Sequence, residues 1–158
     1  MSDKRQIEGR LDGTGKRFAV IASRFNGAVV ERLVDGALDC LRRNGVDEGS
    51  IRVVRVPGAW ELPAAAGVLA AAGEVDALVA VGVVVRGETP HFDYICAQAS
   101  AGLNRVSLDH GLPVGFGLLT CDTPAQAQER AGGKVGNKGW EAALAALEMA
   151  DLLSRLRP

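Results

Sequence analysis

The chain has 158 residues, 47% of them hydrophobic and 23% charged, a composition that excludes an intrinsically disordered protein. Its 18 Lys and Arg residues nearly balance its 19 Asp and Glu residues, so the net charge is −1, which argues against nucleic acid as a partner. A chain of this length suits one domain with one core.

Neither a membrane segment nor a cysteine framework is apparent in the sequence. The longest unbroken apolar run, residues 77–85, has about half the length of a membrane span, and no signal-like apolar segment follows the first residues. The three cysteines, Cys40, Cys96 and Cys121, are odd in number and lack the CxxC spacing of a thiolate metal site. We therefore expect a cytoplasmic protein without a membrane partner, a metal or a disulfide framework.

Short apolar runs alternate with longer helical patterns along the chain. The sequence predicts strands at 16–22, 51–56, 77–85 and about 113–119. The predicted helices are one across 30–41 ending at Asn44-Gly45, one at about 61–72, a long one after Pro90 closed by Gly111, a short one from Thr123-Pro124 to near Arg130, and a last one at about 138–156. Four such strand-helix units predict a parallel sheet with helices on both faces.

Two irregular segments leave alternatives open. Residues 1–14 carry a turn signal at Asp12-Gly13 and a brief strand-like patch at 7–11, so they form either a flexible arm or an edge strand lent to a neighbouring chain. Residues 15–158 are predicted to form the single domain. The glycine-rich segment 130–138 is either a phosphate cradle or a solvated connection, and its composition alone favours the connection.

The strand-to-helix junctions are the candidate sites, because ligands of open parallel α/β sheets bind at the carboxyl ends of the strands. Three aromatic residues, Phe25, Trp60 and Phe92, lie in or next to such junctions beside polar groups. Flat apolar walls with a few polar anchors suit a planar heterocycle. The alternative is that Phe25 and Trp60 only cap the core, and the residues alone do not decide between the two.

The junction at 86–91 carries the strongest hint of chemistry. Thr89 can cap the following helix and Pro90 suits its first position, so free backbone N–H groups there would bind an anion such as phosphate. His91 would lie in the first turn, where the positive helix end favours a neutral imidazole that can accept a proton. The alternative, a surface histidine in a capping motif, is the one that these residues favour by themselves.

Other chemistries find little support. Neither histidine has a second ligand at metal spacing, and GxSxG, GxGxxG and GxxxxGK[ST] motifs are absent. His110 precedes a glycine at a predicted helix end, which suits a residue that meets the helix dipole. Cys121 could be a nucleophile at a strand end, but no histidine is near it in sequence, so a small, partly buried residue is the better interpretation.

Five blocks of sequence, taken together, resemble the lumazine synthase family. They are Ser23-Arg24-Phe25-Asn26, 57–63 (PGAWELP), 87–94 (GETPHFDY), 113–120 (PVGFGLLT) and 130–139 (RAGGKVGNKG). The blocks fall in order along nearly the whole chain from residue 16 onward. Any one of them is weak evidence, but the five in this order are specific.

The resemblance implies a flavodoxin-like three-layer sandwich, with a four-stranded parallel sheet and helices on both faces. It implies an enzyme of riboflavin biosynthesis, a transferase that condenses 5-amino-6-ribitylamino-uracil with 3,4-dihydroxy-2-butanone 4-phosphate. The products would be 6,7-dimethyl-8-ribityllumazine, phosphate and water. No metal or organic cofactor is implied.

The resemblance also implies how the pyrimidine substrate is held. Phe25 would stack on its ring, and Asn26 with the backbone at Val84 and Val85 would contact its polar edge. The ribityl chain would be bound by three residues of the second junction, Ala59, Trp60 and Glu61. Smaller or other aromatic residues also occur in the family at the position of Trp60, so the fit around the ribityl chain would differ.

For the second substrate, the resemblance implies a phosphate site at Glu88 and Thr89 beside a catalytic His91. His91 would move protons during imine formation, phosphate elimination and ring closure. A carboxylate next to a bound phosphate is electrostatically awkward, so we expect the backbone of Glu88 to make the contact and its side chain to point away.

In the family the pocket lies between adjacent subunits of a pentamer, and the matching Phe116, Arg130 and Lys138 come from the neighbouring chain. The resemblance therefore implies a homopentamer or a multiple of pentamers, with riboflavin synthase as a further partner. Free pentamers, pairs of pentamers and icosahedral shells all occur. The short 132–137 connection is compatible with the shell.

Two functions from other classes compete with this one. The first is a non-catalytic lumazine- or flavin-binding protein, or a shell protein, on the same scaffold. His91, Arg130 and Lys138 argue against it, because binding a heterocycle needs no proton shuttle or phosphate clamp. The second is a flavodoxin-type electron carrier, for which the Ser/Thr-rich phosphate loop after the first strand and a strongly acidic composition are missing.

Overall fold

The computed structural model describes residues 5–158 and contains a sheet of four parallel strands in the order β2-β1-β3-β4. The strands are β1 (Phe18–Ser23), β2 (Ile51–Val56), β3 (Ala77–Val85) and β4 (Val114–Cys121). The helices are α1 (Gly27–Arg43), α2 (Leu62–Ala72), α3 (His91–His110), α4 (Pro124–Glu129) and α5 (Lys138–Leu156). Two 3₁₀ turns, η1 (Glu48–Ser50) and η2 (Ala59–Glu61), and a hairpin of β5 (Ala131–Gly133) and β6 (Gly136–Asn137) complete the described chain.

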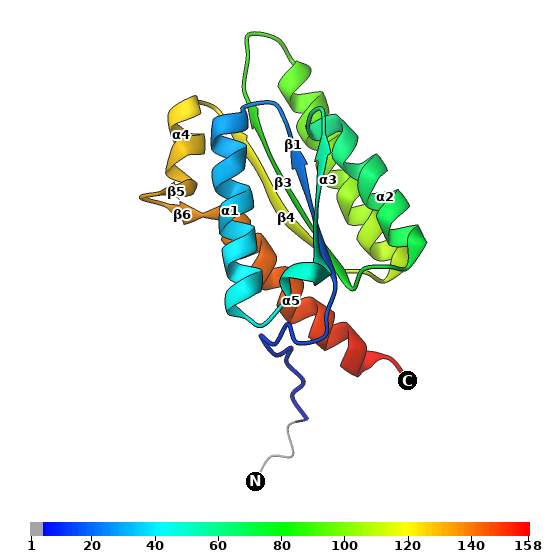
Figure 1. The fold of residues 1–158 in the computed structure, drawn as a ribbon. Coiled ribbons are helices and arrows are strands. Elements are labelled where there is room, and N and C mark those ends of the chain that lie inside the picture. The colour runs from blue at the N-terminus through cyan, green and yellow to red at the C-terminus, as the bar shows by residue number, and fades with distance from the viewer. Residues whose placement is uncertain (1–4) are drawn as a thin grey trace.

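The sheet lies between two layers of helices (Figure 1). β1 is buried on both faces, because its successive side chains point to opposite faces of the sheet. Phe18, Val20 and Ala22 join a hydrophobic cluster with α1 and α5, whereas Ala19 and Ile21 join a second cluster with α2 and α3. The predicted three-layer sandwich is confirmed, and the strand order is that of flavodoxin-like folds.

Helix α5 approaches the sheet and α1 at backbone contact distance, and two glycines make this possible. A Cβ atom built on Gly139 would lie 2.1 Å from the carbonyl oxygen of Leu33 on α1. A Cβ atom built on Gly115 of β4 would lie 2.3 Å from the carbonyl oxygen of Ala142 on α5. The start of α5 is therefore held firmly between α1 and β4.

The structure adds detail at two irregular segments. The connection 130–138 contains the β5–β6 hairpin, in which Ala131 pairs with Asn137 and Gly133 pairs with Gly136. In this single chain residues 7–11 form neither helix nor strand, and the Arg10 N–H donates to the Asp151 carboxylate on α5 (2.8 Å). Pairing of residues 1–14 with a neighbouring chain stays a prediction. Within residues 5–158, no helix combines the length and the apolar character that a membrane crossing requires.

Candidate active site

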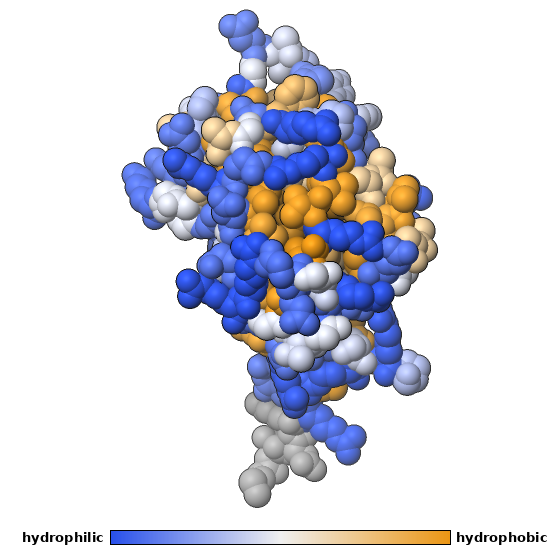
Figure 2. Space-filling view, viewed as in Figure 1, coloured by the Kyte–Doolittle hydropathy of each residue, from blue (hydrophilic) through white to orange (hydrophobic). Residues whose placement is uncertain are grey.

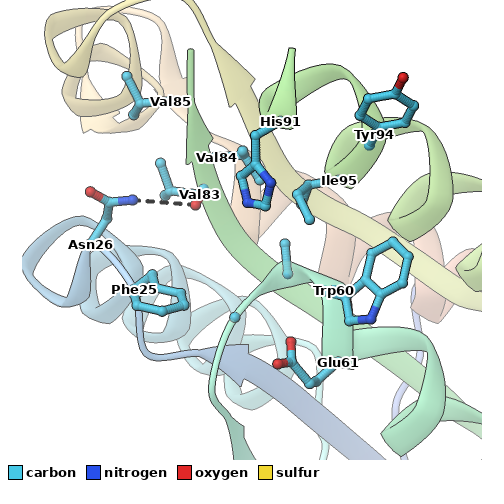
Figure 3. Close-up of a pocket in the computed structure, with 12 residues that line it drawn as sticks. Phe25, Asn26, Trp60, Glu61, Val83, Val84, Val85, His91, Tyr94 and Ile95 are labelled. Atoms are coloured by element: carbon cyan, nitrogen blue, oxygen red, sulfur yellow. Dashed lines mark hydrogen bonds between the residues drawn. The ribbon is translucent and has the colours of Figure 1, made fainter. Parts of the chain in front are cut away.

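A pocket of about 660 Å³ opens at the carboxyl ends of β1 and β3. β1 has β2 on one side and β3 on the other, so the strand order reverses between β1 and β3. The pocket lies at this point of reversal. Twelve residues from the junctions after β1 and β2, from the end of β3 and from α3 line it: Phe25, Asn26, Gly58, Ala59, Trp60, Glu61, Val83, Val84, Val85, His91, Tyr94 and Ile95. Figure 3 shows Phe25 and Trp60 on opposite sides of this space, with His91 of α3 pointing between them.

Asn26 joins β1 to α1 in a backbone conformation that few residues adopt. Its φ of 59° and ψ of 45° lie in the left-handed region, which asparagine tolerates better than most residues. Its side chain does not cap α1, because its Nδ2 donates instead to the carbonyl oxygen of Val83 on β3 (3.3 Å). This bond joins β1 to β3 across the pocket floor and leaves the Asn26 carboxamide oxygen available to a ligand.

The aromatic walls face the pocket rather than the core. Phe25 is 67% exposed and Trp60 is 55% exposed, so the interpretation that they cap the core is wrong. A Cβ atom built on Gly58 would lie 2.7 Å from Cδ2 of Phe25, which shows that the ring of Phe25 packs against bare backbone at this glycine. Both rings therefore offer exposed aromatic surface to a flat ligand in the pocket.

One carboxylate oxygen of Glu61 is unusual, because Oε2 is buried and has no hydrogen-bond partner among the described residues. Oε2 would lie 3.7 Å from a Cβ atom built on Gly58. A buried acceptor without a partner is costly unless a ligand donates to it. The arrangement favours a ligand with hydroxyl or N–H groups on this side of the pocket.

His91 is the first residue of α3, and its exposed side chain lines the pocket. The helix starts one residue later than expected, because Pro90 has a ψ of 5° and precedes the first helical residue. Thr89 Oγ1 lies 3.5 Å from the His91 N–H, too far for a strong cap. The N–H groups of Asp93 and Tyr94 donate to the carbonyl of Pro90 (3.0 and 3.4 Å), so fewer first-turn amides are free than predicted.

Phe92 does not join the aromatic walls, contrary to expectation. It is only 8% exposed, and the guanidinium carbon of Arg86 lies 4.4 Å from the centroid of its ring. Tyr94 and Ile95 line the pocket instead, and neither of them is among the candidates predicted from the sequence. They stand three and four residues after His91, and this helical spacing, which places side chains on one face, could have found them.

The remaining predicted residues do not line this pocket. Glu88 and Thr89 are exposed in the connection that leads to His91. Phe116 lies on the edge strand β4, in a second hollow of about 250 Å³ beside α3. Arg130 Nη1 donates to the carbonyl of Gln126 (3.0 Å) at the end of α4.

Arg130 and Lys138 are neighbours, although eight positions of sequence separate them. The N–H of Lys138 donates to the carbonyl of Arg130 (2.8 Å), across the base of the β5–β6 hairpin. The hairpin and α4 lie on the outer side of α1 (Figure 1). We call residues 130–138 the cationic corner, and it is separate from the pocket of the same chain.

The cysteines offer no activated nucleophile. Burial raises the pKa of the Cys40 thiol to about 11 and also raises the pKa of the Cys121 thiol. Both side chains are buried, which favours the structural interpretation of Cys121. A thiolate would be needed for attack, and its population at neutral pH is therefore small at both positions.

The fold and the pocket define the chain as a flavodoxin-like α/β protein with a site for a flat ligand, and comparison with known proteins narrows this class. Residues 15–154 match the model of the 6,7-dimethyl-8-ribityllumazine synthase family. The chain is 57% identical over 150 residues to the 6,7-dimethyl-8-ribityllumazine synthase of Aquifex aeolicus (strain VF5), with 95% of this chain and 97% of that protein covered.

Two further relatives carry the same name. The protein of Desulfovibrio desulfuricans (strain ATCC 27774 / DSM 6949 / MB) is 53% identical over 156 residues, with 99% of this chain and 100% of the relative covered. The protein of Desulfatibacillum aliphaticivorans is 52% identical over 153 residues, with 97% and 99% covered.

The chain therefore belongs to the 6,7-dimethyl-8-ribityllumazine synthase family. This confirms the family predicted from the five sequence blocks, and with it an enzyme of riboflavin biosynthesis in the transferase class. A non-catalytic binding or shell protein is not favoured.

Proposed function

We propose that the chain condenses 5-amino-6-ribitylamino-uracil with 3,4-dihydroxy-2-butanone 4-phosphate in the pocket described above, without a metal or organic cofactor. The observation that carries this proposal is the convergence of Phe25, Trp60, Glu61 and His91 on one pocket at the switch point of the sheet. The membership of the chain in the 6,7-dimethyl-8-ribityllumazine synthase family supports it.

The pyrimidine substrate would be held by stacking and by a few polar anchors. The exposed ring of Phe25 offers a face to the heterocycle, and the Asn26 carboxamide with the backbone at Val84 and Val85 would contact its polar edge. The ribityl hydroxyls would lie along Ala59, Trp60 and Glu61 and donate to Oε2 of Glu61, which the protein leaves without a partner.

His91 would act as the general acid and base of the condensation. The amine of the pyrimidine attacks the ketone, water and phosphate leave, and the ring closes, so protons must be moved at several steps. A histidine that lines the pocket and is exposed to it can move these protons. Backbone N–H groups at Glu88 and Thr89 would position the phosphate, with the Glu88 side chain turned away.

The phosphate site would be completed by a neighbouring subunit. Phe116, Arg130 and Lys138 do not line the pocket of their own chain, and a guanidinium facing the phosphate would give it a bidentate cation. We infer that these three residues reach the pocket of an adjacent copy in a homopentamer or a multiple of pentamers. Departing negative charge would then be stabilised from across the subunit interface.

An exposed apolar face supports assembly. Figure 2 shows hydrophobic residues gathered over the edge strand β2 and helix α2, where Val53 and Val68 are exposed. Such a face, next to an unpaired strand edge, suits a contact with a second copy. Ile7 and Leu11 of the arm are also exposed, so residues 1–14 are proposed to pair with the neighbour while 15–158 form the domain. A cytoplasmic location and riboflavin synthase as a partner belong to the same proposal.

The test is an absorbance assay of product formation with both substrates. We expect the purified protein to exceed the spontaneous rate. His91→Ala should lower kcat by about 100-fold or more while pyrimidine binding changes by less than about two-fold. Arg130→Ala should chiefly raise the KM for the ketone phosphate, and Arg43→Ala, which removes only a surface ion pair with Asp39, serves as the matched control. Pyrimidine binding without any acceleration would instead identify a receptor.

A further inference from the structure

We propose that Arg86 is a positioning residue that holds the first turn of α3, and with it His91, at the pocket. The inference rests on the proposed role of His91. Arg86 directly follows Val85, which lines the pocket, and His91 lines it again five positions later. The intervening connection 86–90 is exposed throughout, so contacts with other elements are needed to fix the position of the start of α3 relative to the end of β3.

Arg86 directly follows β3 and contacts two further elements, the end of β4 and the first turn of α3. Its backbone N–H donates to the carbonyl of Cys121 (2.9 Å) and its Nε donates to Oδ1 of Asp122 (2.8 Å), which ties it to the end of β4. Its Nη1 donates to Oδ1 of Asp93 (3.3 Å), and its guanidinium carbon lies 4.4 Å from the ring centroid of Phe92. One side chain therefore joins the ends of β3 and β4 to the first turn of α3.

The two α3 residues that Arg86 contacts are those that directly follow His91. Because a helical turn is rigid, fixing Phe92 and Asp93 also fixes the backbone from which the imidazole projects. The hydrogen bonds of 87–90 within the described residues stay local: the long contact of Thr89 with the His91 N–H and the bonds to the carbonyl of Pro90. Arg86 is thus the residue of the connection 86–90 whose side chain bonds this turn to the end of β4.

The charges around Arg86 argue against direct phosphate binding by this residue. Its guanidinium is paired with the carboxylates of both Asp93 and Asp122, so the cluster has an excess of one negative charge. Such a cluster repels a phosphate dianion, and the donors of Arg86 are already engaged. The side chains of the cluster are about half exposed, so the ion pairs add little to the free energy of unfolding and their geometric role matters more.

The experiment measures kcat and both KM values for Arg86→Gln and Arg86→Lys, alone and combined with His91→Ala. Arg43→Gln on α1 is the matched control. We expect Arg86→Gln to lower kcat by about 10- to 100-fold with both KM values changed by less than about three-fold, because a misplaced imidazole slows proton transfer without affecting binding. Arg86→Lys should restore part of kcat, since an ammonium can pair with one carboxylate but cannot bridge two.

The combination with His91→Ala separates positioning from other roles. If Arg86 acts through His91, adding Arg86→Gln to His91→Ala should change kcat by less than about two-fold. An equal loss in both backgrounds would overturn the proposal, as would a kcat unchanged relative to Arg43→Gln. A rise confined to the KM for the ketone phosphate would show that Arg86 binds phosphate, and would also overturn it.

Two further variants separate a failure to assemble, and a failure of the proposed role of His91, from a failure of the inference about Arg86. If Arg86→Gln does not assemble, Asp122→Asn weakens only the side-chain tie to the end of β4, because it removes the carboxylate charge and leaves the backbone bond of Arg86 to Cys121 in place. It should lower kcat in the same direction, by less than Arg86→Gln, with unchanged KM values. A normal kcat in both Asp122→Asn and Arg86→Lys would then contradict the proposal. His91→Ala alone tests the proposed function. Normal turnover in that variant would remove the role of His91, whereas a slow His91→Ala beside a normal Arg86→Gln would remove only the inference about Arg86.

Discussion

The pocket and the cationic corner both contain sequence blocks that are typical of the family, yet they lie in different parts of the fold. The pocket is assembled within one chain, because the carboxyl ends of neighbouring parallel strands meet at one edge of the sheet. The corner places Arg130 and Lys138 side by side on the other side of α1, away from that edge. A motif can therefore be fully formed in a chain and still have no part in the pocket of that chain.

The two regions are also held in place by different means. The pocket depends on Asn26, whose left-handed backbone and bond to Val83 join two strands across its floor. The corner depends on Asn137, whose Oδ1 accepts the N–H of Trp140 (3.0 Å) and whose Nδ2 donates to the carbonyl of Arg32 (3.0 Å). Each region can therefore be altered without the other.

The largest effect is expected from mixing subunits that are defective in different regions. His91→Ala damages the pocket and Arg130→Ala damages the corner, so each variant alone should be nearly inactive at low ketone phosphate. Random co-assembly should place an intact pocket beside an intact corner at about a quarter of the sites, and restore about a quarter of the activity. Product formation after co-expression of the two variants measures this.

The matched control for that experiment mixes His91→Ala with Phe25→Ala. Both changes lie in the pocket, so every site keeps one defect, and the activity should stay at the average of the two variants measured alone. If the first mixture also stays inactive although mass spectrometry shows mixed assemblies, the corner does not serve the pocket of a neighbour.

A smaller effect should separate two aromatic residues that look alike in sequence. Phe92→Ala empties a buried site and should lower the free energy of unfolding by about 3 kcal/mol. Phe25→Ala removes an exposed ring and should change stability by less than about 0.5 kcal/mol, but weaken pyrimidine binding by about 10-fold. Denaturant unfolding and a fluorescence titration measure the two quantities. Equal losses of stability in the two variants would contradict the outward placement of Phe25.

The smallest effect is expected at the cap of the corner. Asn137→Ala removes the N-cap of α5 and should cost about 1 kcal/mol of stability. Because Asn137 also anchors the segment that carries Arg130 and Lys138, the KM for the ketone phosphate should rise by about two- to five-fold. Asn44→Ala, which removes a side-chain bond to the carbonyl of Cys40 at the end of α1, is the matched control. A similar KM change in Asn44→Ala would show a general loss of stability instead.

The strands, the helices and the pocket residues that follow the strands could be predicted from local patterns. The apolar runs and helical spacings identified the four strands and their helices to within a few residues, since burial and periodicity are properties of short segments. The candidates that follow the strands, such as Phe25, Trp60 and His91, do line one pocket, because the topology of a parallel sheet brings its strand ends together.

Side-chain direction and long-range neighbours were beyond local patterns. Phe92 is buried under Arg86, whereas Tyr94 lines the pocket. The helix that starts after Pro90 has fewer free backbone N–H groups in its first turn than the sequence predicts. The composition of the corner favours a solvated connection, and only the structure shows that it contains a hairpin whose base joins Arg130 to Lys138.

By itself, then, the sequence determined the alternation of strands and helices, the family, and the residue types available for chemistry. These depend on composition and on spacing along the chain. Only the tertiary structure decided which of those residues share a pocket, which lie in a separate corner, and which residues Arg86 contacts at the start of α3. The reason is physical: such relations are set by how helices and strands far apart in sequence pack against each other, and a side chain one position along a helix points about 100° away.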